Sequence, residues 1–276
     1  MPNPVLFPAI ERPEAEIQLV FLHHAGGSSY PYLQLAHKLS GFIEVYCLEL
    51  AGRGARFSEP FQADVETVLS DICTSIKHLG LGDNKPLLLC GHSLGAELAY
   101  QVAYRLEREA PEKQFSLMIS ARGFIEPGTL GSERNEVLSD ADILRLLEQY
   151  EGTPSEVLAD PEWRKYVIGV MRNDLSLLAS LSRLPKPVLN VQTHLVGGNQ
   201  DKRVPVSQLA EWRRAFTVPV TQKIFTGGHF YLFTSDEVIP WIEERARELA
   251  EQTSVRLSHG YLTECRCALN DSNQVE

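Results

Sequence analysis

One stretch, Leu87 to Gln101 (LLLCGHSLGAELAYQ), limits most narrowly what this chain can fold into. An apolar run leads into the pentapeptide GHSLG, and a helical pattern rich in small residues follows. Glycines on both sides of Ser93 permit a sharp turn and let the helix pack closely on the strand. Such a turn strains the serine backbone and presents its hydroxyl above the sheet edge, which predicts a nucleophile. The alternative is a serine that only caps the helix.

Short apolar runs alternate with longer helical patterns along most of the chain. The runs have few polar positions, as expected of strands that a parallel sheet buries on both faces. This alternation predicts an α/β fold, with a mostly parallel sheet flanked by helices. The expected strands are Ile17–Leu22, Ile43–Leu50, Pro86–Gly91, Phe115–Ser120, Val188–Gly198 and Val220–Phe225, and the expected helices are Asp64–Leu79, Leu94–Glu109, Val206–Phe216 and Ser235–Ala250.

The region from about Gly123 to Arg183 interrupts this alternation with charged amphipathic stretches and no convincing strand. It is too long for a plain loop, so we expect a helical lid insertion of two or three helices in a single domain of residues 1–250. The alternative is a small helical subdomain with no gating role. Residues 251–276 are polar and weakly patterned, which predicts a flexible C-terminal tail.

A serine nucleophile needs a histidine base and a carboxylate that orients the base. In sheets of this kind, the acid and then the histidine are expected downstream of the serine. Asp201 comes soon after the apolar run that ends at Val196, and His229 comes soon after the run that ends at Phe225. Both positions lie where loops leave the carboxyl ends of strands, the edge at which such sheets build their sites. We therefore predict a catalytic triad of Ser93, Asp201 and His229.

Simpler interpretations of these polar residues stay open. Asp201 could cap the helix that begins near Pro205, and His229 could be a core histidine in a glycine-containing turn. Two further histidines have weaker claims to a role. His92 lies inside the turn but is expected to point away from the serine, and His194 lies within a strand, so we interpret both as bystanders.

Attack on a carbonyl group also requires donors for the oxyanion that develops. The backbone amide of Leu94 directly follows the serine and is the first predicted donor. The loop after the first predicted strand reads HHAGGS, and its glycines allow the backbone to approach a substrate closely. We assign the second donor to the amide of Ala25. The same letters could form an ordinary glycine turn, and the paired histidines invite a metal site but lack a nearby third ligand.

Composition and charge exclude several other functions. The formal net charge of −10 argues against nucleic acid and anionic membranes as main partners, because both require a basic surface. No apolar run approaches a membrane span, and the N-terminus does not resemble a secretory signal, so we expect a cytoplasmic protein. The five cysteines have no disulfide or zinc spacing, so we expect no metal and no cofactor, and Cys90 is interpreted as a buried structural thiol.

The sequence resembles the stand-alone type II thioesterases that serve polyketide synthases and nonribosomal peptide synthetases. Seven ordered motifs between about Ile17 and Arg247 carry this resemblance. They are HAGGS (His24–Ser28), GRGARFSEP (Gly52–Pro60), GHSLGAELAYQVA (Gly91–Ala103), GTPSEVLADPE (Gly152–Glu162), RNDLSLL (Arg172–Leu178), GGNQD (Gly197–Asp201) and GGHFYL (Gly227–Leu232).

The resemblance implies an α/β-hydrolase fold with a helical lid, and Ser93, Asp201 and His229 fall on the family's triad positions. Family members remove acyl groups from the phosphopantetheine arm of acyl- or peptidyl-carrier proteins, which frees stalled synthases or releases products. Two positions depart from the family pattern. His23 stands where proline usually precedes the HAGG histidine, and Ala51 stands where PGRG would be typical. Since proline fixes the backbone, its loss could loosen the oxyanion loop.

Carrier proteins are usually acidic and would be repelled at long range by a chain of charge −10. We therefore expect recognition through a local patch or through the pantetheine arm itself, and we expect the enzyme to be a monomer. The predicted patch consists of Arg53, Arg56, Lys202 and Arg203. The alternative is that these side chains are ordinary solvated charges. Lid residues that could line the acyl cavity, or simply pack in the lid core, are Trp163, Tyr166, Met171 and Leu175.

Two other functions share these sequence features. An esterase or lipase acting on small esters would use the same triad and fold, since a fold does not settle a function. A non-catalytic module that binds carrier proteins would keep the lid and lose turnover. The complete set of Ser93, Asp201 and His229 argues against the second alternative.

Overall fold

A computed structural model describes residues 4–128, 138–150 and 153–271. Its centre is a seven-stranded sheet in the order β1-β3-β2-β4-β5-β6-β7, and every neighbouring pair is parallel except β1 with β3. All six predicted strands are present. The strands are β1 (Leu6–Ile10), β2 (Ile17–Leu22), β3 (Ile43–Leu48), β4 (Leu87–His92), β5 (Phe115–Ser120), β6 (Thr193–Gly198) and β7 (Thr221–Phe225).

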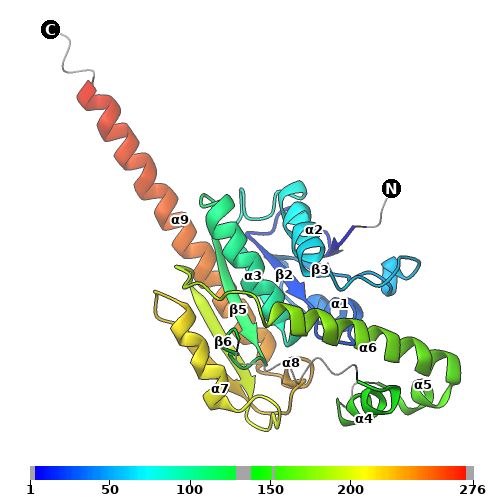
Figure 1. The fold of residues 1–276 in the computed structure, drawn as a ribbon. Coiled ribbons are helices and arrows are strands. Elements are labelled where there is room, and N and C mark those ends of the chain that lie inside the picture. Colours follow the sequence, from blue (N-terminus) through cyan, green and yellow to red (C-terminus); the bar gives the residue numbers. More distant parts are fainter. Residues whose placement is uncertain (1–3, 129–137, 151–152, 272–276) are drawn as a thin grey trace.

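Helices cover both faces of the sheet (Figure 1). The predicted helix from Val206 to Phe216 is divided into an α-helix and a 3₁₀ helix, and α1 was not predicted. The α-helices are α1 (Tyr30–Lys38), α2 (Val65–His78), α3 (Leu94–Glu109), α4 (Asp140–Tyr150), α5 (Ser155–Ala159), α6 (Pro161–Leu181), α7 (Val206–Ala210), α8 (Tyr231–Thr234) and α9 (Val238–Asp271), and the 3₁₀ helices are η1 (Gly54–Arg56) and η3 (Glu211–Ala215).

Alternate residues of each central strand point into two separate cores. In β2, Val20 and Leu22 join a cluster that includes the apolar residues of α2 and α3. Leu19 and Phe21 join a second cluster with residues of α1 and α9. Because strand side chains alternate with a period of two, a strand buried on both faces is expected to be mostly apolar along its whole length. This explains why the central strands were readily predicted from the sequence.

The edge strand β1 was not predicted. Its sequence LFPAI is short and contains Pro8, which cannot donate a backbone hydrogen bond and is normally confined to sheet edges. Only Leu6 of this strand is fully buried, so the strand lacks the apolar continuity of its neighbours. It pairs antiparallel with β3 and closes one edge of the sheet.

The insertion between β5 and β6 is helical, as predicted. It contributes α4, α5 and α6, and residues 129–137 and 151–152 within it lie outside the described part of the chain. The last turns of α6 enter the main core through Leu177 and Leu181. The first part of α6 extends past the sheet and carries α4 and α5 at its outer end (Figure 1). A gating role for this insertion stays a prediction.

The helix predicted to end at Ala250 continues beyond it, whereas the flexibility of residues 251–276 stays a prediction. Helix α9 has 34 residues, continues to Asp271 and projects from the body of the molecule (Figure 1). Residues 251–271 contain no proline and only one glycine, so nothing local ends the helix that begins at Val238. The division into a domain of residues 1–250 and a separate tail stays a prediction.

Among the described residues, no helix is long and apolar enough to cross a membrane. Cys47, Cys73 and Cys90 are free thiols, and Cys90 is fully buried, as predicted. Burial raises the pKa of the Cys90 thiol well above its usual value, so this residue is a neutral packing group. The side chains of Cys265 and Cys267 lie outside the described part of the structure.

The turn between β4 and α3 is so tight that its glycines are required. A Cβ atom at Gly95 would overlap the carbonyl oxygen of Leu22 in β2, and one at Gly91 would overlap the carbonyl of Gly95. These neighbours are backbone atoms, which cannot rotate away as a side chain could. Close contact between α3 and the strands therefore depends on the absence of side chains at both positions.

We predict that Gly95→Ala lowers the free energy of unfolding by more than about 2 kcal/mol, because backbone must shift to admit the methyl group. Gly41→Ala is the matched control, since Gly41 is exposed and a Cβ atom there meets nothing within 4 Å. Urea unfolding of both variants measures the difference. Equal stability of the two variants would contradict the close packing described for α3.

Candidate active site

The backbone at Ser93 has the strain expected of a nucleophile turn. Its φ of 56° and ψ of −111° lie outside the conformations that residues other than glycine usually adopt. The Ser93 amide donates to the carbonyl of Ser120 at 2.8 Å, which ties the turn to β5. The Ser93 side chain makes no capping hydrogen bond to α3. The alternative of a serine that only caps the helix is therefore not supported by the geometry.

The loops after β6 and β7 bring Asp201 and His229 together. The imidazole Nδ1 of His229 lies 2.8 Å from Oδ2 of Asp201. The other carboxylate oxygen accepts from the amides of Arg203 and Val204, at 2.9 and 3.2 Å. Asp201 thus holds His229 and also the backbone turn before α7, but its side chain does not cap that helix, whose N-cap residue is Pro205. One oxygen serves each purpose.

The environment of Asp201 keeps its carboxylate ionised. Burial by itself would raise its pKa, but the hydrogen bonds from His229 and from the two backbone amides hold the pKa below its usual value. An ionised carboxylate can accept only, so Nδ1 of His229 must carry the proton in this contact. This fixes the tautomer in which Nε2 is available as a base.

His92 is closer to the candidate site than the sequence analysis expected. It directly precedes Ser93, and its ring centroid lies 5.3 Å from that of His229. Its Nδ1 lies 2.7 Å from the Ser120 hydroxyl, which in turn lies 2.6 Å from the hydroxyl of Tyr231. The expectation that His92 points away from the site is wrong, because its buried ring packs against the candidate base. No pattern in the sequence indicates this contact, which joins residues 137 positions apart along the chain.

The predicted oxyanion loop runs from His23 to Ser29, directly after β2. Gly26 adopts a φ of +74°, which favours glycine, and the side chain of Met171 lies against it. The Gly26 amide donates to Oδ2 of Asp174 at 2.8 Å, and the Gly27 carbonyl accepts from Arg53 at 3.0 Å. Side chains from two distant segments therefore hold this loop. Among the described residues, no group of three or more side chains could hold a metal ion.

Arg53 and Asp174 form a buried, two-pronged ion pair. The two guanidinium nitrogens of Arg53 lie 2.6 and 2.7 Å from the two carboxylate oxygens of Asp174. Arg53 is 2% exposed and Asp174 is 0% exposed. Burial would lower the pKa of Arg53, but Asp174 outweighs this and raises it. The pair joins the loop after β3 to helix α6 and, through Asp174, to the oxyanion loop.

The predicted docking patch is wrong for two of its four residues, Arg53 and Arg56, which are buried. Arg53 is not accessible to a partner, and Arg56 is 8% exposed and bonded to Glu59 and to the carbonyl of Glu49. Arg53 is turned inward by its pair with Asp174 on α6, and Arg56 by its bonds within its own loop and to the residue just after β3. Of the four predicted residues, Lys202 is exposed and Arg203 is partly exposed.

The insertion has a small apolar core beside the oxyanion loop. Ile143, Leu147, Ile168 and Met171 are buried together, with Ala25 and Leu175 packed against them. Trp163 is 54% exposed and contacts Tyr166, whose hydroxyl donates to the carbonyl of Gly52 at 3.0 Å. Met171 and Leu175 therefore lie near Ala25, whereas Trp163 lies at the surface.

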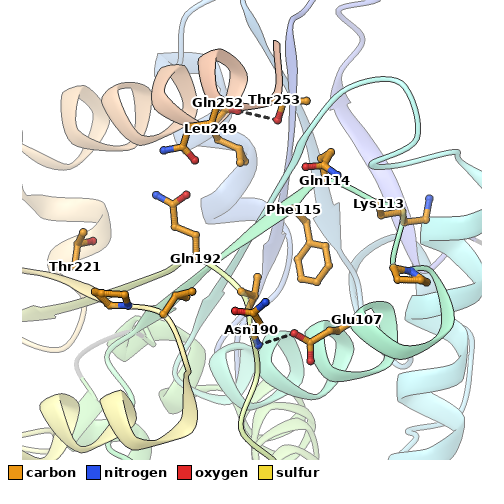
Figure 2. A pocket seen from close by; sticks show the side chains of 14 residues that line it. Glu107, Lys113, Gln114, Phe115, Asn190, Gln192, Thr221, Leu249, Gln252 and Thr253 are labelled. Atoms are coloured by element: carbon orange, nitrogen blue, oxygen red, sulfur yellow. Dashed lines mark hydrogen bonds between the residues drawn. The ribbon is translucent and has the colours of Figure 1, made fainter. Parts of the chain in front are cut away.

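A cavity of about 600 Å³ lies away from these residues (Figure 2). It is formed near the amino ends of β5, β6 and β7 together with residues of α9. Labelled side chains around it include Phe115, Gln192, Thr221 and Leu249. Since the candidate nucleophile, base and acid follow the carboxyl ends of β4, β7 and β6, this cavity is at the opposite edge of the sheet. We assign it no part in catalysis.

Buried histidines make the stability depend on pH. Burial lowers the pKa of His23 and His194 to about 4 and of His24 to about 3, and it lowers the pKa of His92 well below its usual value. Each binds a proton in the unfolded chain near pH 6.5 but not in the folded chain. Stability is therefore fully present above the unfolded pKa and is lost as pH falls from 6.5 toward 4. Burial raises the pKa of Glu49, so the folded chain can bind one proton there that the unfolded chain does not. This partly offsets the loss of stability that the histidines cause as pH falls.

We predict that the free energy of unfolding falls by about 1.4 kcal/mol per pH unit for each buried histidine between pH 6 and 5. In His194→Phe, the slope should decrease by one such contribution. Urea unfolding at pH 7, 6 and 5 measures both slopes. A stability that stays constant from pH 7 to 5 would refute the assignment of neutral buried histidines.

Loss of the buried carboxylate should be costly. We predict that Asp174→Asn lowers the free energy of unfolding by about 3 kcal/mol, because Arg53 stays buried without its counter-ion. Asp140→Asn is the control, since Asp140 pairs with Arg172 on the surface and should contribute less than about 1 kcal/mol. Chemical unfolding of both variants measures the two losses of unfolding free energy. Similar small losses would show that the buried ion pair contributes no more to stability than the exposed pair.

Comparison with known proteins identifies relatives of this chain. Over 216 residues the chain is 30% identical to the "Probable cadicidin biosynthesis thioesterase" of Streptomyces griseus, covering 78% of this chain and 58% of that protein. It is 28% identical over 220 residues to "Thioesterase PikA5" of Streptomyces venezuelae, covering 80% and 77%.

Among solved structures, the type II thioesterase BorB from the borrelidin biosynthetic cluster matches with a TM-score of 0.73 and 28% identity, covering 87% of this chain and 97% of that one. The agreement extends to the α/β-hydrolase fold, with its mostly parallel sheet and flanking helices. The model of the thioesterase domain family matches residues 17–246. The chain belongs to the thioesterase domain family.

Proposed function

We propose that this chain is a serine hydrolase that removes acyl groups from the phosphopantetheine arm of acyl- or peptidyl-carrier proteins. The observation that carries the proposal is the hydrogen bond of 2.8 Å between Asp201 and His229, beside the strained turn at Ser93. Membership of the thioesterase family supports a reaction on thioester bonds. Relatives named for cadicidin and borrelidin biosynthesis support an editing or product-release role in a biosynthetic pathway, which we propose to be a polyketide or nonribosomal peptide pathway.

In the proposed first step, Nε2 of His229 takes the proton of the Ser93 hydroxyl as its oxygen attacks the thioester carbonyl carbon. The amides of Ala25 and Leu94 donate to the oxyanion that forms. The carbon–sulfur bond then breaks, His229 gives its proton to the departing thiolate, and Ser93 keeps the acyl group. Asp201 stabilises the imidazolium throughout.

In the second step, His229 takes a proton from water, and the resulting hydroxide attacks the acyl-serine carbonyl. The bond to the Ser93 oxygen breaks, His229 returns the proton to that oxygen, and a free carboxylic acid leaves. The sum of the two steps is hydrolysis of one thioester by one water molecule. The proposed mechanism requires no metal and no cofactor.

The lid core suggests where the acyl group would lie. Met171 and Leu175 pack beside Ala25, the proposed oxyanion donor, so an acyl chain bound at Ser93 would pass close to them. Burial of an apolar chain against these side chains would contribute about 0.8 kcal/mol per methylene group. We propose that these two residues, more than Trp163, influence the preferred acyl length.

The proposal includes a monomeric enzyme in the cytoplasm. With Arg53 and Arg56 buried, the carrier would meet Lys202 and Arg203, which adjoin Asp201 in the chain. An acidic carrier would then be attracted locally despite the net charge of −10. No observation favours the esterase or the non-catalytic binding module, and the following experiment separates both from the proposal.

We predict that the wild type removes acetyl, propionyl or longer acyl groups from loaded carrier proteins and leaves the phosphopantetheine attached. Ser93→Ala should lower the rate at least about 10⁴-fold, because no nucleophile remains. Ser207→Ala, at an exposed serine on α7, is the control and should keep the wild-type rate. Intact mass of each carrier before and after incubation measures the loss.

The other outcomes identify the alternatives. If every acyl group stays on its carrier while small esters are cleaved, the chain is an esterase. If nothing is cleaved and a fluorophosphonate probe does not label Ser93 in the folded protein, the chain is a binding module. Each result would exclude the carrier thioesterase.

A further inference from the structure

His23 directly follows β2 and is the first residue of the predicted oxyanion loop. It is 0% exposed, so its side chain points into the protein and not into solvent. Histidine does not restrict the backbone through a ring as proline would, so another interaction must orient the loop at this position. The hydrogen bonds of the imidazole show what that interaction is.

Both ring nitrogens of His23 have backbone partners. Nδ1 lies 2.8 Å from the carbonyl oxygen of His24, and Nε2 lies 3.4 Å from the amide nitrogen of Leu50. A carbonyl oxygen accepts and an amide donates, so Nδ1 must carry the proton and Nε2 must lack one. The contacts therefore select one neutral tautomer. Burial, together with the charge of Arg53, lowers the pKa of His23 to about 4, which agrees with a neutral ring at physiological pH.

The carbonyl that His23 holds belongs to the peptide unit between His24 and Ala25. In a trans peptide the C=O and the following N–H point in opposite directions and lie in one plane. Fixing the His24 carbonyl therefore fixes the direction of the Ala25 N–H. The Gly27 amide donates to the same carbonyl at 3.1 Å, so the peptide is held from two sides. Within the part of the chain that the structure describes, the Ala25 amide donates to no protein acceptor.

The other anchors of this loop hold different peptide units. Asp174 accepts from the Gly26 amide, and Arg53 donates to the Gly27 carbonyl. Neither contacts the peptide between His24 and Ala25. His23 is thus the described side chain that controls this unit directly, and it does so from the strand that the loop follows.

We propose that His23 is a positioning residue for oxyanion stabilisation: its Nδ1–H orients the His24–Ala25 peptide so that the Ala25 amide points toward the substrate oxyanion. The inference rests on the proposed role of Ala25 as an oxyanion donor. A misdirected donor weakens binding of the transition state more than binding of the substrate.

The test compares His23→Phe and His23→Asn on an acyl-carrier substrate. Phenylalanine keeps the ring but has no donor, whereas asparagine places an N–H close to the position of Nδ1. We expect His23→Phe to lower kcat by about 10- to 100-fold with little change in KM, since one oxyanion donor contributes about 10²- to 10³-fold. His23→Asn should keep kcat within about threefold of the wild type, because it restores the hydrogen bond.

His194→Phe is the matched control. His194 is a second buried histidine, with Nδ1 bonded to the Thr221 hydroxyl at 2.6 Å, on a strand that does not lead into the oxyanion loop. The His194→Phe variant should be less stable than the wild type but should keep the wild-type kcat. If His23→Phe does not fold, the kcat of His23→Asn can be compared with that of His23→Gln instead. Glutamine places its amide nearer to the position of Nε2 than of Nδ1, so His23→Gln should have the lower kcat.

Three results would overturn the inference: a wild-type kcat in His23→Phe, an equal loss in His23→Asn, or an equal loss in His194→Phe. Each result would show that the loss of kcat does not come from loss of the Nδ1–H donor of His23. In all three, the wild type still hydrolyses the substrate and the proposed function stands. A wild-type enzyme without activity on any acyl carrier would instead refute the proposed function and the inference together.

Discussion

The ion pair between Arg53 and Asp174 is the interaction on which the candidate site most depends. Two opposite charges lie where solvent does not reach, so each is tolerable only because the other is present. Each member of the pair also holds the loop after β2: Asp174 accepts from the Gly26 amide, and Arg53 donates to the Gly27 carbonyl. One electrostatic requirement thereby fixes three separate segments: the loop after β3, helix α6 and the loop after β2.

Features that depend on local sequence could be predicted. The central strands are mostly apolar because both faces are buried, and the turn at Ser93 is marked by the glycines that its close packing requires. Asp201 and His229 could be selected because each follows a recognisable strand. A parallel sheet brings such loops to one edge, so their hydrogen bond follows from topology together with spacing.

Features that depend on distant partners could not be predicted. Arg53 and Asp174 are 121 residues apart, and nothing near either residue indicates that the other neutralises it, so Arg53 was interpreted as an exposed charge. The contact of His92 with His229 also joins residues that are far apart in the sequence. Strand β1 was missed because Pro8 and partial exposure remove the usual strand pattern. The continuation of α9 beyond Ala250 was not predicted because the residues there are polar, although they include no proline and only one glycine up to Asp271.

Helix α6 is both part of the insertion and part of the core. Leu177 and Leu181 anchor its last turns beneath the sheet, and Asp174 lies one turn before Leu177. The segment from Asp174 onward is therefore structurally continuous with the hydrolase body, although the sequence places it inside the insertion. An engineer who exchanges this insertion for another, to change the acyl preference, should place the junction before Asp174. A graft that includes this residue would replace the side chain that holds the Gly26 amide as well as the proposed walls of the acyl site.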